Sequence, residues 1–384
     1  MSAHLLVVLL FWLSCALLVS VYVLYPLLVR LAAARFGVPA QASEAPLTVS
    51  IIVTAYNEEK GLAAKLDNLL SARISSGIAE IIVASDASSD STDDIVRSYA
   101  RAGVRLLRVE GRQGKTACQN VAAAAASGDV LIFTDATTRL HSDALRNLVG
   151  WFADSSVGCV AGRLVYQSSS RNVTGRGNEA YWDYEIKLRL AESALGSLIG
   201  VSGCLYGVRR SAYRPIDPRL ISDFVITMKM REQSLRTVLA PDAMCFEETL
   251  ARGAHELSMR VRVAIRSLNA LFCERKFLNP LKFGLFAWQL WFHKVLRYAS
   301  PFLWIIALAA NMILAAQQPV YAALLAGQIV VLLMGIAGFA LQSRLSHMGL
   351  LSRPYYFLLT NVASLIAALR YVRGERMVTW KPMR

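Results

Sequence analysis

Three short apolar runs, each ending in polar and acidic residues, constrain the fold of this chain more than any other feature. They are IIVTAYNEE at residues 51–59, IIVASDASSDST at residues 81–92 and VLIFTDATT at residues 130–138. Such β-branched runs are typical of parallel strands that are buried on both faces. Strands of an open α/β sheet end at a ligand crevice, so acidic residues at those ends can meet at one site. The sequence therefore predicts an α/β protein with a doubly wound, mostly parallel sheet.

The segments between these runs have the character of helices. Residues 62–73, 92–102, 116–127 and 142–154 alternate with the expected strands, as in a doubly wound sheet. A further helix is expected at residues 178–198, where apolar and aromatic side chains recur about once a turn. Residues 111–120 (GRQGKTACQN) place Lys115 in a glycine-containing loop, which suits the binding of a phosphate group.

Long apolar segments predict membrane helices at both ends of the chain. Hydrophobic residues make up 55% of the 384 residues, more than is usual for a soluble domain. Residues 5–29 lack ionisable side chains and are long enough to cross a hydrocarbon core of roughly 30 Å. A cleaved signal peptide is the alternative, but no basic residues precede this run and it is too long. We expect an uncleaved membrane anchor.

The C-terminal part is expected to form a membrane hairpin. No charge occurs between Arg297 and Arg344, and Pro319 divides this stretch into spans at 299–316 and 320–341. Residues 283–297, aromatic with a basic end, resemble an interfacial helix that feeds the first of these spans. A third apolar run at 354–369 has only 16 residues, so we favour a helix that does not cross, with interfacial and re-entrant placements both open.

The distribution of Lys and Arg predicts the orientation. Basic residues follow the first span, precede the second and follow the third, which places residues from about 45 to 297 in the cytoplasm. The basic tail after residue 369 then lies inside if 354–369 does not cross. The net charge of +14 is explained by an anionic lipid surface and does not require a nucleic acid. Six cysteines without metal-binding spacing indicate buried thiols in a reducing compartment.

These observations divide the chain into three parts. Residues 1–44 are expected to form a transmembrane anchor and linker, because the segment before residue 46 is rich in Ala and Pro. Residues 45–282 would form the cytoplasmic catalytic domain. Residues 283–384 would comprise the interfacial helix, the transmembrane hairpin and a short membrane-associated helix.

The four motifs in this order resemble the nucleotide-sugar half of family 2 glycosyltransferases of the GT-A fold. Among them are the membrane-bound synthases of exopolysaccharide, cellulose, hyaluronan and poly-N-acetylglucosamine. The resemblance implies an inverting glycosyltransferase that uses a nucleotide sugar, with UDP-sugars expected first, and a polysaccharide or lipid-linked glycan as acceptor. It also implies a multi-pass protein of a bacterial inner membrane, with hexosyl or N-acetylhexosaminyl transfer and an export or assembly partner.

For the donor, the resemblance implies contacts from the first two strand ends. Thr54, Tyr56 and Glu58 match nucleotide-contacting positions, and Asp86 matches the residue that receives a base or ribose donor. Lys115 would hold the diphosphate as a point charge. Each assignment has an alternative. Residues 56–59 could be a plain polar turn and Lys115 a surface lysine, and the polar run after Asp86 could be a helix N-cap. We assign the cap to Asp90 and the site to Asp86.

The resemblance also implies a divalent cation. Asp135 heads D-A-T, where the family usually has D-x-D, so Asp135 and Thr137 are the expected ligands of Mg²⁺ or Mn²⁺. Both ions prefer oxygen ligands and bind through one or two carboxylates and substrate phosphates. Thr137 brings a hydroxyl without a charge, which leaves the metal dependence less secure than a full carboxylate pair would.

The acceptor end carries the expected base. Asp223 resembles the second carboxylate of the family's E-D or D-D motif, with Ser222 in the first position. As general base it would deprotonate the acceptor hydroxyl during in-line attack; a carboxylate stabilising a helix N-terminus is the alternative, and both can hold. The loop with Ser202, Gly203 and Cys204 resembles the family's acceptor-lining loop.

Arg262 matches the arginine of the family's Q-x-x-R-W motif, which grips the diphosphate. Val263 replaces the stacking Trp and Met259 replaces the Gln, which weakens the case for a processive polymerase. The alternative for the basic stripe is that its residues simply form the solvated face of a helix: Arg260, Arg262 and Arg266. Two further functions remain open: transfer to polyprenyl phosphate, and an inactive scaffold of a polysaccharide-secretion complex.

Overall fold

The structure is a computed structural model that describes residues 2–38, 40–44, 46–72, 74, 77–167, 173–248, 253–340 and 349–377. Its centre is one mixed sheet with the strand order β3-β2-β1-β4-β7-β6-β8-β5. The strands are β1 (Val49–Ala55), β2 (Ile78–Asp86), β3 (Val104–Val109), β4 (Val130–Asp135), β5 (Arg139–Leu140), β6 (Val157–Gln167), β7 (Leu205–Arg209) and β8 (Arg236–Glu248). Strands β3, β2, β1 and β4 are parallel neighbours, whereas β7 is antiparallel to both β4 and β6. The predicted α/β class and mostly parallel sheet are confirmed.

The three apolar runs form adjacent strands because their side chains are buried on both faces of the sheet. Every residue of β1 is buried. Ile51 and Val53 belong to one hydrophobic cluster with α3 and α6, while Ile52 belongs to another with α5 and α8. The register pairs Thr54 of β1 with Asp135 of β4, and Asp86 ends β2. The strand ends therefore meet along one edge, as the sequence predicted.

The four helices expected between the strands are present with shorter bounds, whereas the helix expected at 178–198 begins earlier, at Val173, and ends at Leu195. The helices around this sheet are α3 (Leu62–Leu70), α4 (Thr92–Ser98), α5 (Lys115–Ala125), α6 (Ala144–Val149), α7 (Val173–Leu195), α8 (Ser222–Glu232) and α9 (Gly253–Cys273). The second and fourth predicted helices finish in 3₁₀ turns at Ala100–Ala102 and Gly150–Ala153. Gly103 ends the former because its φ of 83° is left-handed. Arg73, the expected end of the first helix, lies outside the described residues.

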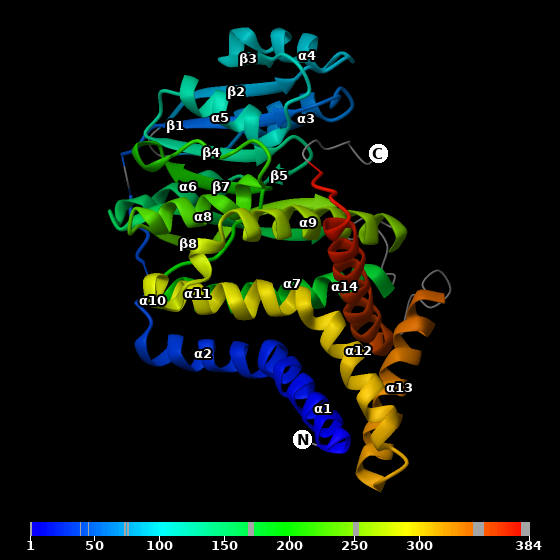
Figure 1. Ribbon diagram of the computed structural model, residues 1–384. Helices are drawn as coiled ribbons and strands as arrows, with labels where there is room; N and C mark the ends of the chain where they lie inside the picture. Colours follow the sequence, from blue (N-terminus) through cyan, green and yellow to red (C-terminus); the bar gives the residue numbers. More distant parts are fainter. Residues whose placement is uncertain are drawn as a thin grey trace.

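Two membrane-side helices bend at π-helical turns. The first apolar segment is helical from α1 (Ala3–Val19) through Ser20–Leu24 to α2 (Tyr25–Phe36). After the short α10 (Pro280–Phe283), α11 (Leu285–Leu290) runs through Trp291–Val295 into α12 (Leu296–Leu314). In Figure 1, α2 and α11 run roughly parallel to α7, whereas α1 and α12 slant away beside α13 (Pro319–Ala340). A π-turn inserts an extra residue and redirects the helix. Part of each helical segment can therefore run along the catalytic domain while the other part points away from it.

Within the described residues, four helices are long and apolar enough to cross a membrane: Ala3–Phe36, Leu285–Leu314, Pro319–Ala340 and Leu351–Val372. The last belongs to α14 (Gly349–Val372), which continues through Pro354 and packs on α7, α9, α12 and α13. The length argument against its crossing is therefore wrong, since the helix is 24 residues long. The side on which its basic end lies stays a prediction, and residues 378–384 of the tail lie outside the described part.

Candidate active site

Asp86 holds the loop that presents Lys115. Its buried carboxylate accepts hydrogen bonds from the backbone N–H groups of Gln113 (2.8 Å) and Gly114 (3.1 Å). Arg112 donates to it as well (3.3 Å) and stacks over the ring of Tyr56, 3.2 Å from its centroid. Asp86 therefore fixes the backbone of the GRQG loop through these hydrogen bonds. The sequence did not reveal this role. Its predicted contact with the nucleotide, and that of Tyr56, stay predictions.

The predicted helix cap at Asp90 is wrong by one residue, because Ser91 is the N-cap of α4. Asp90 directly precedes that cap and supports the start of the helix. Its carboxylate accepts hydrogen bonds from the backbone N–H groups of Thr92 (3.0 Å) and Glu59 (3.2 Å), and α4 begins at Thr92. The same contacts tie the loop after β2 to the loop after β1. Glu58 and Thr54 from β1 and its loop line a large cavity of about 1350 Å³ at this edge of the sheet.

Lys115, Asp135 and Asp223 converge around Gly203. Lys115 opens α5 and forms an ion pair with Asp135 at the end of β4. A Cβ atom placed on Gly203 would lie 2.8 Å from the Lys115 Nζ, 2.9 Å from the Asp223 Oδ2 and 3.7 Å from the Asp135 Oδ2. The predicted glycine of the acceptor loop therefore leaves room for these charged groups, which a side chain at position 203 would displace. The three groups come from α5, β4 and α8, which are far apart in sequence.

Asp223 lies in the first turn of α8 and faces the cavity. Its backbone carbonyl accepts a hydrogen bond from the Val201 N–H (2.9 Å), which fixes α8 to the acceptor loop. Burial raises the pKa of the Asp223 carboxyl above its usual value, and the positive charges of Lys115 and Arg266 limit the rise. A carboxylate with a raised pKa beside cations is suited to accept a proton, so the role of base stays open to test.

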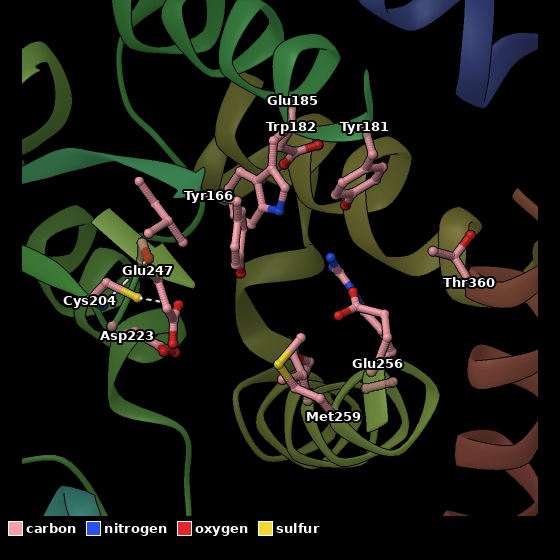
Figure 2. Close-up of a pocket in the computed structure, with 18 of the residues that line it drawn as sticks. Tyr166, Tyr181, Trp182, Glu185, Cys204, Asp223, Glu247, Glu256, Met259 and Thr360 are labelled. Carbon is pink, nitrogen blue, oxygen red and sulfur yellow. Dashed lines mark hydrogen bonds and ion pairs between the residues drawn. The ribbon is translucent and has the colours of Figure 1, made fainter. Parts of the chain in front are cut away.

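Glu247 on β8 is a second acidic group in the cavity. It accepts a weak hydrogen bond from the Cys204 Sγ (3.4 Å), and the register places it beside Tyr166 of β6. Figure 2 shows Cys204, Glu247 and Asp223 gathered on one side of the cavity, opposite Glu256. Burial and the nearby charge of Asp135 raise the pKa of Glu247 to about 7. The carboxyl groups of Asp223 and Glu247 thus both lie beside the acceptor loop.

We expect this pKa to appear in the stability of the protein. Between about pH 4.5 and 7 the folded state binds more protons at Glu247 than the unfolded state, so its contribution to stability falls as the pH rises. Glu247→Gln removes this titration. The thermal midpoint of the variant should therefore rise relative to the wild type between pH 5 and pH 8, measured in detergent. A constant difference over that range would contradict the raised pKa.

The oxygen ligands expected for a divalent cation are present, although they are few. Among the described residues no group of three or more His, Cys, Asp and Glu side chains is placed to hold a metal ion. Asp135 and the exposed Thr137 both line the cavity at the end of β4. Mg²⁺ and Mn²⁺ bind through one or two carboxylates and complete their shell with phosphates and water. The residues thus fit an ion shared with a diphosphate.

The basic stripe on α9 divides into two kinds of residue. Arg260 is occupied, because it forms an ion pair with Glu256 (2.9 Å) and donates to Asn178 (3.3 Å). All three arginines line the cavity, but among the described residues Arg262 and Arg266 form no ion pair. Burial lowers the pKa of Arg262, while the charge of Asp135 opposes this effect. A solvated helix face therefore does not describe this stripe, and the contact of Arg262 with a diphosphate stays a prediction.

Sequence reasoning missed the membrane-side wall of the cavity. His293 lies between two buried glutamates, with Nε2 2.7 Å from Glu185 and Nδ1 2.7 Å from Glu192. Arg297 pairs with Glu185 at 2.9 Å, and the aromatic side chains of Tyr166, Tyr181 and Trp182 line the space between the domain and the helices (Figure 2). These residues come from β6, α7, the π-turn before α12 and the start of α12. The acidic residues within an aromatic helix at 178–198 were the one available signal.

The sheet and this cavity together define a class of protein. Carboxylates lie at the ends of β2 and β4. The carboxylate of β4, Lys115 at the start of α5 and Asp223 at the start of α8 meet beside the glycine of one loop, as the resemblance to GT-A glycosyltransferases implied. Residues 50–216 match the model of a family described as Glycosyl transferase family 2. The chain therefore carries a family 2 glycosyltransferase domain, as the resemblance implied.

Known proteins agree with this class. The chain is 29% identical over 168 residues to a beta-monoglucosyldiacylglycerol synthase of Trichormus variabilis, which covers 43% of this chain and 36% of that protein. It is 30% identical over 178 residues to an N-acetylglucosaminyltransferase of Azorhizobium caulinodans, covering 44% and 45%. The chain thus spans less than half the length of these curated relatives.

One solved structure is similar over nearly the whole chain. It is the mannosyltransferase PcManGT from Pyrobaculum calidifontis, in complex with GDP-Man and Mn²⁺. The TM-score is 0.71 at 25% sequence identity, covering 95% of this chain and 100% of that one. The similarity therefore extends beyond the catalytic sheet to the membrane-side helices.

Proposed function

We propose that this chain is an inverting glycosyltransferase of a bacterial inner membrane, which transfers a hexosyl or N-acetylhexosaminyl group from a nucleotide sugar. Residues 45–282 would form the cytoplasmic catalytic domain, between an anchor at 1–44 and the membrane segments of 283–384. The acceptor would be a lipid-linked glycan, a membrane lipid or a growing polysaccharide. UDP-sugars are the first candidate donors.

The observation that carries this proposal is the continuity of the cavity. It is lined at one end by Lys115, Asp135 and Asp223, and at the other by Tyr22, Ser300 and Asn361 of the apolar helices. Ser300 donates to Asn361 (2.6 Å) and bonds with Tyr22 (3.0 Å), so α12 joins α14 and the first helix there. An acceptor anchored among these helices would reach the strand ends without leaving the protein.

The reaction would run as a single displacement. The acceptor hydroxyl oxygen forms a bond to the anomeric carbon, the bond from that carbon to the diphosphate breaks, and Asp223 receives the hydroxyl proton. Lys115 and Arg262 hold the departing diphosphate. When bound, Mg²⁺ or Mn²⁺ at Asp135 and Thr137 would supply positive charge to the leaving diphosphate. Ser202, Gly203 and Cys204 would position the acceptor beside Asp223.

A panel of nucleotide sugars tests this proposal. Detergent-purified full-length protein is given UDP-glucose, UDP-N-acetylglucosamine or GDP-mannose with Mn²⁺ and membrane lipid extract, and nucleotide release is measured. GDP-mannose is included because PcManGT was solved with GDP-Man. Release from one donor that depends on the extract would support transfer. If none of the three nucleotide sugars is consumed, the result would favour the alternative function, an inactive scaffold in a polysaccharide-secretion complex.

Topology gives a separate prediction. We expect a cysteine introduced at Arg376, after α14, to be labelled only from the cytoplasmic side, because basic segments remain inside. The native Cys273 is exposed in the catalytic domain and would first be replaced by Ser. Labelling of position 376 by an impermeant reagent in intact cells would instead mean that α14 crosses the membrane.

A further inference from the structure

We propose that Lys65 is a positioning residue, which fixes the expected metal ligands and the acceptor loop relative to one another. The proposal rests on the proposed function, since it concerns how the same site is held in a reactive geometry. Lys65 lies in α3, is only 3% exposed and does not line the cavity. It would therefore act through the groups that it holds and not by contact with a substrate.

Lys65 holds both ends of the turn that carries the expected metal ligands. Residues 135–138 form this turn, which a hydrogen bond from the Thr138 N–H to the Asp135 carbonyl closes (3.3 Å). The Lys65 Nζ donates to the Thr134 hydroxyl (2.9 Å), just before the turn, and to the Thr138 carbonyl (2.6 Å), at its end. One ammonium group thus fixes the backbone that carries Asp135 and Thr137.

The same ammonium group is linked to the acceptor loop through Thr134. The Thr134 hydroxyl accepts the hydrogen bond from Lys65 and donates its own proton to the Cys204 carbonyl (2.7 Å). Both Lys65 and Thr134 are buried, so the loss of either bond would leave a polar group without water to replace its partner. This chain of hydrogen bonds therefore connects α3, the turn and the loop that would position the acceptor.

Packing alone does not explain a lysine at this position. The buried face of α3 includes Leu62, Leu66 and Leu69, which belong to one hydrophobic cluster with β1 and β4. Lys65 is bound by a hydroxyl and a carbonyl, with no ion pair among the described residues. Burial lowers its pKa to about 8, although the charge of Asp135 opposes this shift. Burying a cation is costly, whereas an apolar side chain would fill the same space without that cost. The position therefore fits a residue whose hydrogen bonds hold the turn.

The test uses two substitutions that break this chain of hydrogen bonds at different points. Lys65→Met keeps the apolar stem of the side chain but removes the ammonium group, whereas Thr134→Val keeps the shape and removes the hydroxyl. In detergent-purified full-length protein, Mn²⁺ affinity at saturating UDP is measured by electron paramagnetic resonance. Nucleotide release from a donor that the wild type consumes is measured with and without membrane lipid extract, which gives the gain on adding the acceptor.

We expect Lys65→Met to weaken Mn²⁺ binding by about 5- to 100-fold, the effect of buried polar groups left without a hydrogen bond, and to lower the gain by a similar factor. Thr134→Val should lower the gain as well, with a smaller effect on Mn²⁺ because Lys65 still holds the end of the turn. Thr134→Ser, which retains the hydroxyl, should behave like the wild type. The double variant should lose less than the product of the two single losses, since both substitutions break one chain.

Asn68→Ala is the matched control. Asn68 lies one turn further along α3 and binds the backbone of Leu140, accepting from its N–H (2.8 Å) and donating to its carbonyl (3.0 Å). Its loss should lower the thermal midpoint but leave Mn²⁺ affinity and the gain unchanged.

Wild-type Mn²⁺ affinity and gain in Lys65→Met would make Lys65 an ordinary core residue and overturn the proposal. Losses in the two variants that simply multiply would do the same, because the two residues would then act separately. If Lys65→Met does not fold, equal behaviour of Thr134→Val and Thr134→Ser would overturn the proposal instead. A wild type that binds no Mn²⁺ with UDP would overturn the role of the turn. A wild type that consumes no donor would count against the proposed function, while the Mn²⁺ measurements would still test Lys65.

Discussion

Replacing Asp135 by Ala is expected to lower sugar transfer by on the order of a thousandfold or more. Asp135 is the chief carboxylate available to a diphosphate-bound cation, and charge neutralisation by such an ion contributes several kcal/mol to the transition state. The substitution also leaves Lys115 without its ion-pair partner. Nucleotide release, Mn²⁺ binding in the presence of UDP by electron paramagnetic resonance, and the thermal midpoint would be measured together.

Thr137→Asp is the informative companion. It restores the second carboxylate of the family motif at an exposed position that lines the cavity, so it should be tolerated and should tighten Mn²⁺ binding. Asp135→Asn keeps the shape of the side chain and separates loss of charge from loss of packing. Full activity of the wild type after EDTA treatment would show that no divalent cation is needed, whatever the effect of Asp135→Ala.

Asp223→Asn should lower turnover by about 10²- to 10⁴-fold, the usual contribution of a positioned base. Asparagine preserves the size of the side chain but does not accept the proton. Affinity for the nucleotide sugar should change little, because Lys115, Asp135 and Arg262 are expected to hold the diphosphate. Donor affinity and turnover would therefore be measured on the same preparation. Asp217→Asn, in the loop before α8, is the control outside the cavity.

Two results would reassign Asp223. A loss of donor affinity that accounts for the loss of turnover would make it a structural or donor residue, as its place in the first turn of α8 allows. Turnover near the wild-type level would move the base to another carboxyl. Glu247 is then the group to examine, because it faces the same loop and has a pKa near neutrality. The side chain of Glu248 lies outside the described residues.

The sequence by itself determined the sheet and its polar edge. The buried runs at β1, β2 and β4 have no polar alternation, so they can only be strands covered on both faces, and their order in the chain places Asp86 and Asp135 at one edge. The apolar segments likewise required helices, since a charge-free run of that length has few other structures. These are local patterns, and each is complete within one stretch of chain.

Only the tertiary structure decided what surrounds that edge. Lys115, Asp223 and Gly203 meet because α5, α8 and the acceptor loop close on one point, and no spacing in the sequence encodes that contact. Arg260 forms an ion pair whereas the buried Nε of Arg266 has no hydrogen-bond partner, and this difference depends on which groups pack against α9. The bends at the π-turns and the full length of α14 also arise from packing, because propensity is weak compared with burial between neighbouring helices. Short sequence motifs thus determine which polar residues lie at the strand ends. The cavity that joins those strand ends to the membrane helices depends on the whole fold.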